Sequence, residues 1–384
     1  MTWPSVQINQ INQLQGETDE IERVLLFVGT GGKNAGKVLP VNTQTDFNAL
    51  LGEGDSTLKS MLNAAMLNAG QNWSAYVRVL GTTETGDGDN KTVETESWAQ
   101  AVRDAQTVAS VEGVVLTDAI ANKAAINEAA VLRDELLAKF GRRVWFILAV
   151  QEPQQGEAWA DYVERLSALQ ESIAASSVQL VPRLFGNEPG VLAGRLCNRA
   201  VTIADSPCRV ATGALQALGR DDLPVDGNGT VLDLATLQAL EAKRYSVPMW
   251  YPDYDGFYWA DGRTLDVEGG DYQVIEYVRI VDKVARRVRL QAIAKIGDRS
   301  LNSTPGSIAA HQSLFAKTLR EMARAGQING VTFSGEVKPP QDDDVTISWQ
   351  SKEKVAIYIV VRPYECPKDI TVSLLLDASL TESN

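Results

Sequence analysis

Short runs of consecutive apolar residues recur along the first half of the chain. A run that lacks polar alternation is typical of a strand buried on both faces of a parallel sheet. Stretches with helical periodicity separate the runs, and strands that alternate with helices predict an α/β sheet with crossover helices. The predicted strands are Val24 to Val28, Ala75 to Leu80, Gly113 to Leu116, Val144 to Val150 and Val178 to Leu184. The predicted helices lie around residues 57–68, 97–108, 123–140, 158–174 and 191–203.

The pattern changes near Tyr245, where an aromatic-rich segment begins. This segment leads into two long amphipathic stretches, about 271–296 and 306–325, and then into strand-like runs at 345–349, 355–361 and 370–376. A second unit of mixed α+β type is therefore expected. We predict an N-terminal arm over residues 1–22, an α/β domain over 23–245, an α+β domain over 246–362 and a C-terminal arm over 363–384.

Both predicted arms carry apolar side chains that have no local partner. These side chains are Val6, Ile8 and Ile11 in the first arm and Ile370, Val372, Leu374 and Leu376 in the second. At ~3.3 Å per residue, residues 1–16 reach about 50 Å and the last 22 residues about 70 Å. A lone strand is unstable in water, and an open sheet edge attracts another chain. The arms can pair within their own domain, or they can be donated to neighbouring copies as added strands.

The composition restricts the classes of function. The chain has 384 residues, of which 44% are hydrophobic and 22% charged, and this is a globular profile. A net charge of −13 disfavours direct nucleic-acid binding. The longest apolar runs have seven residues, against the ~20 needed to cross a bilayer, and Met1 to Pro4 show no secretory-signal pattern. The three cysteines, Cys197, Cys208 and Cys366, are not spaced like a metal site, so we expect a reducing compartment, no metal and no cofactor.

Two motifs have the spacing of catalytic sites but lack the rest of the chemistry, and the one histidine has no such motif around it. Gly31 to Lys37 has most of a phosphate-binding P-loop, yet Val38 replaces the hydroxyl residue that should follow, and Pro40 interrupts the expected helix. A glycine-rich turn is the simpler interpretation, with nucleotide binding as the remaining alternative. Ser56 is three residues before Lys59 but is better explained as a helix N-cap. His311 is the single histidine and flanks an apolar stripe, so we expect a structural residue and no enzyme.

Basic residues are concentrated on the two amphipathic helices of the second unit. On the first helix, Arg279, Lys283 and Arg286 lie opposite the widest apolar face, and Arg287 and Arg289 flank them. On the second helix, the basic residues opposite the apolar stripe are Lys317, Arg320 and Arg324. Ile275, Leu290 and Ile293 interleave with the first set. Residues 271–330 contain ten basic and five acidic residues, a balance of +5, whereas the remainder carries −18. This polarity favours an acidic partner or self-association, and the alternative is two helices with ordinary basic outer faces.

The order of these features resembles the contractile tail sheath proteins of bacteriophages, a family that includes the sheaths of R-type pyocins and type VI secretion systems. Val24 to Gly29, Pro40 to Thr43, Asp46-Phe47 and Leu51-Gly52 are similar to the start of the family pattern, and Ala75 to Val79 resembles its next strand. Tyr258 to Thr264, the helix with Arg279, Val281 and Asp282, and the strands that end at Arg362-Pro363 resemble its C-terminal part. The chain is short for this family, which suggests a compact version like those of small phages of the P2 or Mu kind.

The resemblance implies a structural protein of the virion, assembled in the bacterial cytoplasm, that is not an enzyme. Copies would stack as hexameric rings around an inner tail tube, with the α/β domain outward and the C-terminal domain against the tube. Arms from neighbouring subunits would complete a shared β-sheet. The implied partners are other copies, the inner tube, the baseplate and the terminator or neck proteins. The basic residues on one of the two helices would contact the tube, and we favour those on the first helix. A non-contractile structural or scaffold protein of similar fold is the alternative.

Overall fold

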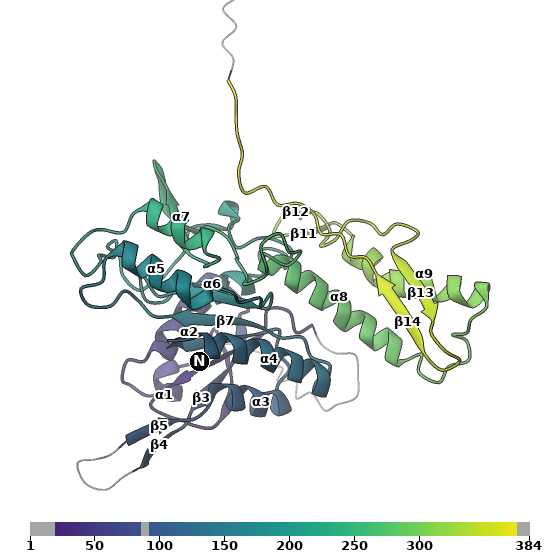
Figure 1. Cartoon of the computed structure of the whole chain (residues 1–384), viewed down its shortest axis with the longest axis horizontal. Coiled ribbons are helices and arrows are strands. Elements are labelled where there is room, and N and C mark those ends of the chain that lie inside the picture. Colours follow the sequence, from purple (N-terminus) through teal and green to yellow (C-terminus); the bar gives the residue numbers. More distant parts are fainter. Residues whose placement is uncertain (1–19, 86–91, 375–384) are drawn as a thin grey trace, which may run out of the picture.

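A six-stranded sheet forms the centre of the first unit of the computed structural model, which describes residues 20–85 and 92–374 (Figure 1). The strand order is β2-β3-β1-β6-β7-β8, and all neighbours are parallel except β2, which runs antiparallel to β3 at one edge. The strands are β1 (Leu25–Thr30), β2 (Val38–Asn42), β3 (Ser74–Leu80), β6 (Gly113–Ile120), β7 (Trp145–Val150) and β8 (Val178–Pro182). The five predicted apolar runs are the five parallel strands, which confirms the predicted α/β sheet.

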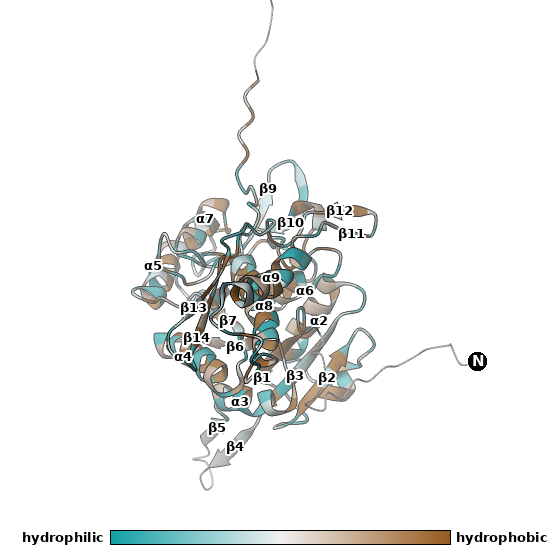
Figure 2. Cartoon of the chain, turned by 90° about the vertical axis from the view of Figure 1, so that its right-hand side faces the viewer, coloured by the Kyte–Doolittle hydropathy of each residue, from teal (hydrophilic) through white to brown (hydrophobic). Residues whose placement is uncertain are grey.

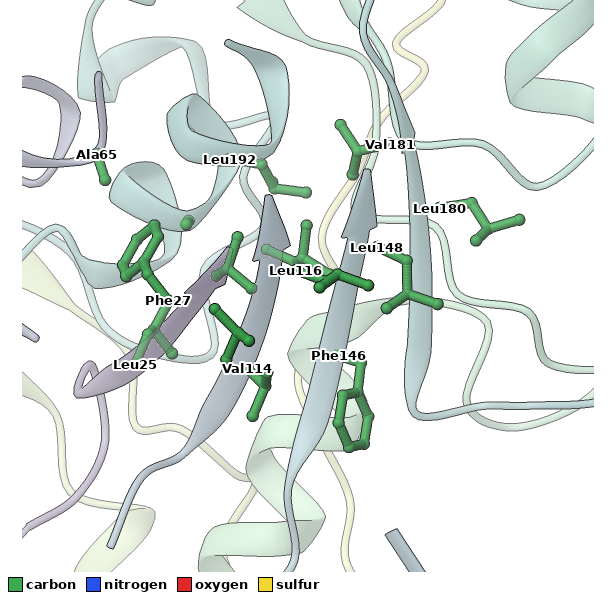
Figure 3. Packing of buried hydrophobic residues seen from close by; sticks show 14 of the residues in the cluster. Leu25, Phe27, Ala65, Val114, Leu116, Phe146, Leu148, Leu180, Val181 and Leu192 are labelled. Atoms are coloured by element: carbon green, nitrogen blue, oxygen red, sulfur yellow. The ribbon is translucent and has the colours of Figure 1, made fainter. Parts of the chain in front are cut away.

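Helices α2 (Thr57–Ala69), α3 (Trp98–Val108), α4 (Lys123–Phe140) and α6 (Glu188–Cys197) pack against the strands of this sheet. The first unit also contains α1 (Phe47–Leu51), α5 (Trp159–Gln170), the 3₁₀ turn Val210–Thr212 and α7 (Leu234–Ala242). Helix α6 approaches the backbone of α2 closely because Gly190 and Gly194 face it: a Cβ at Gly194 would lie 2.3 Å from the carbonyl oxygen of Ala65. Figure 3 shows Phe27, Leu116 and Leu148 from neighbouring strands, together with Leu192 of α6, in the resulting core.

Two hairpins extend the first unit. One is formed by β4 (Thr82–Thr85) and β5 (Thr92–Thr95), and the other by β9 (Pro248–Tyr251) and β10 (Tyr254–Trp259). The base of the second hairpin belongs to the core of the sheet, since Val247, Trp259 and Leu265 are buried in the same apolar cluster as the sheet strands. Residues that follow the predicted boundary at 245/246 therefore still pack with the first unit.

The second unit is smaller and begins within a long helix. Its elements are α8 (Ile275–Ile293), α9 (Pro305–Met322), β11 (Gly326–Ile328), β12 (Val331–Phe333), β13 (Val345–Trp349) and β14 (Val355–Ile359). Ile275 and Val278 of α8 lie in the cluster of the first unit, whereas Ile280 and Val284 lie in a second cluster with Phe315 and Leu319 of α9. Helix α8 is therefore shared by both cores, and Figure 1 shows it running from one unit into the other.

The chain after β14 contains no helix or strand within the described residues. It crosses the body as an extended segment and then leaves it (Figure 1, yellow). The strand expected at 370–376 is absent from residues 370–374 of the isolated chain, and residues 375 and 376 lie outside the described residues. Within the described ranges, every helix is too short or too polar to cross a bilayer.

Candidate inter-subunit surfaces

The basic residues of α8 face acidic residues of the same chain. The guanidinium of Arg279 donates to both carboxylate oxygens of Glu112, with N···O distances of 2.6 and 2.9 Å, and Arg279 is only 2% exposed. Burial alone would raise the pKa of Glu112, but the charge and hydrogen bonds of Arg279 outweigh it and the pKa is lowered. Glu112 directly precedes β6 and also accepts from the backbone N–H of Arg23 at 2.6 Å. This pair therefore joins α8 to the central sheet.

Other charges of α8 are paired in the same way. The ammonium of Lys283 donates to both carboxylate oxygens of Glu336 at 2.8 Å. Arg286 pairs with Glu22, and Arg287 pairs with Glu20 at 2.9 Å. Asp282 of the same helix accepts from Arg133 of α4 at 2.8 and 2.9 Å. These contacts tie α8 to the first unit, to the start of the described chain and to the segment after β12.

The prediction of an exposed basic stripe on α8 is therefore wrong for Arg279 and Lys283, which are 2% and 7% exposed. Helical periodicity assumes a single core on one side of the helix. Helix α8 instead lies between two cores, so residues opposite the first apolar face are also buried. Of the other residues in this set, Ile275 is fully buried, whereas Leu290 and Ile293 are 37% and 47% exposed. Arg289 is exposed, and its guanidinium lies against Gly141 at the end of α4.

The basic residues of α9 are exposed, as their spacing predicts. Lys317, Arg320 and Arg324 all face solvent, while Leu319 and Met322 on the opposite side are buried. Lys317 lies 3.7 Å from Glu321, and Arg320 donates to the backbone carbonyl of Ser313 at 2.6 Å. These local contacts leave the charges at the surface, so contact of this stripe with a partner remains a prediction.

A lysine fixes the C-terminal arm to the body before the arm leaves it. Lys368 forms ion pairs with Asp261 and with Glu276, the latter at 3.1 Å. Glu276 is 1% exposed, and its second oxygen has no hydrogen-bond partner among the described residues. Burial opposes the charge of Lys368, but the two carboxylates outweigh this effect and raise the pKa of Lys368. Two buried acids thus share one cation, and that cation comes from the arm.

Beyond Lys368 the arm presents apolar side chains to solvent. Ile370, Val372 and Leu374 are 72%, 73% and 91% exposed, which is unusual for three aliphatic residues at alternating positions. The C-terminal sheet is also incomplete, because β13 and β14 form a two-stranded sheet that no further described strand joins. Tyr358 of β14 and Val360 just after it are 59% and 47% exposed. Val6, Ile8, Ile11 and Leu376 lie outside the described residues.

The catalytic motifs take structural roles. Gly31 to Lys37 is a turn that leads into the edge strand β2 and not into a helix, so the helix N-terminus of a P-loop does not follow it. Ser56 accepts from the backbone N–H of Lys59 at 3.2 Å as the N-cap of α2. His311 is buried, with its Nδ1 2.9 Å from the carbonyl oxygen of Ser307. In the part of the chain that the structure describes, no group of three or more His, Cys, Asp or Glu could hold a metal ion.

Comparison with known proteins assigns the family. Residues 3–263 match the model for the DUF2586 N-terminal domain, and residues 271–379 match the model for the DUF2586 C-terminal domain. The chain is also 56% identical, over 98% of both chains, to a protein of Haemophilus phage HP1 that is assigned as a tail sheath protein. The chain belongs to the phage tail sheath family.

Solved structures of sheath proteins share the fold. The sheath tail protein of Desulfitobacterium hafniense aligns with a TM-score of 0.55 and 11% identity, covering 94% of this chain and 96% of that protein. The sheath tail protein of Listeria innocua aligns with a TM-score of 0.55 and 9% identity, covering 90% and 93% of the two chains. The match to the phage protein confirms the resemblance to tail sheath proteins, and the solved structures show the same fold. A phage tail sheath protein is a structural component of the virion, and no catalytic function is indicated.

Sequence reasoning missed the acidic residues that pair with α8 of this sheath protein. Glu112, Glu22 and Glu336 carry no motif, and Glu112 lies 167 positions before its partner Arg279. The available signal was the excess of basic residues on a helix that also carries many apolar side chains. Such a helix can be a surface, or it can be a buried helix whose charges are paired elsewhere in the chain.

Proposed function

We propose that this chain is the subunit of a contractile tail sheath, which polymerises as stacked hexameric rings around the inner tail tube. Contraction of that polymer drives the tube through the host envelope. The observation that carries the proposal is the C-terminal arm, which exposes Ile370, Val372 and Leu374 while the body contains an unfinished sheet of β13 and β14.

The C-terminal arm of one subunit can add a strand to the β13–β14 sheet of another. A two-stranded sheet has open edges, and an extended segment with alternating apolar residues can add to such an edge as a further strand. The arm leaves the body after Lys368, so its own chain does not hold residues 370–374 against β13 or β14. Strand addition to a neighbour would cover the exposed apolar side chains and supply backbone hydrogen bonds. The predicted N-terminal arm would act in the same way.

The other contacts between subunits have to break and form again when the polymer contracts. Exposed charge pairs contribute about 0–1 kcal/mol each, so they can break and form again in another register. Lys317 and Arg320 on α9 and Arg324 just after it supply exposed charges of this kind. Because Arg279 and Lys283 are buried by their own chain, we assign the contact with the tube or with another subunit to the α9 residues. The baseplate and the terminator or neck proteins would bind the ends of the polymer, which assembles in the host cytoplasm.

Truncation tests the proposal. Deletion of residues 369–384 keeps Lys368 and every described helix and strand, so the variant should fold and remain monomeric. Ile370→Asp/Val372→Asp/Leu374→Asp should have the same effect, and Thr371→Asp/Ser373→Asp is the matched control on the alternate side of the arm. Electron microscopy and sedimentation distinguish the outcomes. Sheath-like tubes formed by the truncated chain would refute the proposal that this arm links subunits.

A further inference from the structure

The hairpin of β9 and β10 carries a cluster of tyrosines at the surface of the first unit. Tyr251, Tyr254 and Tyr258 have ring centroids 5.6 to 6.3 Å apart. Tyr258 is 5% exposed at the base of the cluster, whereas Tyr251 and Tyr254 are 39% and 55% exposed. Tyrosine is enriched at the energetic centres of protein interfaces because it brings a large apolar area at a low entropy cost. Two such rings side by side in solvent indicate a contact surface.

The body of the protein holds this hairpin in one orientation. Phe257 packs edge to face against Phe185 at 5.1 Å and against Trp250 at 5.8 Å. The carbonyl of Phe257 accepts from the backbone N–H of Leu215 at 2.8 Å. A Cβ at Gly256 would lie 2.7 Å from Cβ of Ala214, so the hairpin also fits closely against the preceding loop. The tyrosines are therefore presented on a fixed support, which lowers the entropy cost of binding.

The charges of the hairpin tip are complementary to those of α9. Asp253 and Asp255 flank Tyr254, and residues 248–260 contain no lysine or arginine. On α9 and just after it, the three basic residues of the exposed stripe outnumber the single acid, Glu321. Arginine side chains also stack on tyrosine rings. The acidic, tyrosine-rich hairpin tip thus complements the basic face of α9.

The two surfaces lie on different parts of the same molecule. In Figure 2, β9 is at the upper edge of the body, whereas α9 faces the viewer near the centre. When two different patches bind each other from one copy to the next in a head-to-tail arrangement, the repeated contact generates rings or helical polymers.

We infer that the tip of the β9–β10 hairpin docks onto the exposed basic face of α9 in a second copy of the chain. The inference rests on the proposed function, because it takes a second copy as the partner. Tyr251 and Tyr254 form the centre of the contact, and Asp253 and Asp255 pair with Lys317, Arg320 and Arg324. This contact uses other residues than strand addition by the arms does.

Charge exchange tests the pairing. Asp253 has a φ of 60°, a conformation that asparagine tolerates well, so the tip variant is Asp253→Asn/Asp255→Lys. The helix variant is Arg320→Glu/Arg324→Glu. Each variant alone should weaken self-association of the full chain about tenfold, and the combination should restore most of the loss. Asp221→Asn/Asp222→Lys, in an exposed loop, matches the change in net charge of the tip variant and should associate like the unchanged chain.

A photo-crosslinking amino acid at Tyr254 identifies the partner surface directly. In assemblies of the full chain, we expect the crosslink to join this position to residues 305–324 of another copy. Assemblies whose crosslinks lie elsewhere, or charge variants that associate normally, would overturn the inference and leave the proposed function intact. An unchanged chain that stays monomeric at high concentration would overturn the proposed function and the inference with it.

Discussion

Arg279 and Glu112 form a doubly hydrogen-bonded ion pair, with N···O distances of 2.6 and 2.9 Å, between α8 and the start of β6. Both residues are only 2% exposed. Because α8 also belongs to the core of the second unit, this pair connects the central sheet to the C-terminal sheet that we propose to be shared between subunits. Force applied to the C-terminal sheet would therefore reach the α/β body through α8.

Replacing Arg279 with Met should strongly destabilise the fold. The change leaves Glu112 charged in a buried site, and removal of one partner from a buried pair costs about 3–5 kcal/mol. Arg287→Met is the matched control on the same helix, because its partner Glu20 is largely exposed and the expected cost is about 0–1 kcal/mol. Urea denaturation followed by circular dichroism gives both values. Equal losses in the two variants would contradict the assigned role of the buried pair.

Acid should weaken the same connection. The pKa of Glu112 is lowered from 4.5 because Arg279 outweighs the opposing effect of burial. An acid with a lowered folded-state pKa contributes stability above its unfolded pKa, and this contribution is lost as the pH falls through the folded-state value. The free energy of unfolding of the native chain should decrease below about pH 4.5, and Glu112→Gln should reduce that pH dependence. A variant with the native pH profile would show that Glu112 does not titrate in this way.

Gly194→Ala should destabilise the first unit. The new Cβ would lie 2.3 Å from the carbonyl oxygen of Ala65, so α2 and α6 would have to separate, at a cost of about 1–3 kcal/mol. Gly306→Ala is the control, because its Cβ would meet nothing within 4 Å in the first turn of α9. The control should be neutral or more stable by up to about 1 kcal/mol. Thermal unfolding of both variants measures the difference, and a stabilising Gly194→Ala would refute the close approach of the two helices.

Lys368→Met should weaken the attachment of the C-terminal arm to the body. The substitution leaves the carboxylates of Asp261 and Glu276 without their shared cation, and Glu276 is buried. We expect faster hydrogen exchange in residues around 261 and 276, faster proteolysis of the arm and weaker polymerisation. Lys338→Met is the matched control, because its partner Glu365 is mostly exposed. If the variant polymerises like the native chain although its arm is cleaved faster, then the attachment of the arm at Lys368 does not matter for assembly.

The central sheet could be predicted from sequence because its signal is local. Five apolar runs without alternation correspond to β1, β3, β6, β7 and β8, and the helix predicted at 123–140 has those bounds in the structure. The edge strand β2 was missed because it is short and contains Pro40, which a strand tolerates only at an edge. The strands β13 and β14 were also found at or near their predicted positions.

The role of the α8 charges could not be predicted, because it depends on residues far away in the chain. Arg279 and Arg324 were both predicted to lie opposite an apolar stripe, yet one is buried against Glu112 and the other is exposed. Periodicity identifies the two faces of a helix but not whether a second core covers the polar one. The same limit applies to the arms, whose alternating residues predict a strand but do not identify its partner.

Electron cryomicroscopy of the polymer formed by the full chain tests the central claim most directly. The account predicts that residues 370–374 of each subunit form a strand hydrogen-bonded to β13 or β14 of a neighbouring subunit. A reconstruction in which these residues fold back onto β13 or β14 of their own chain, or in which subunits associate while the arms remain unpaired, would contradict it.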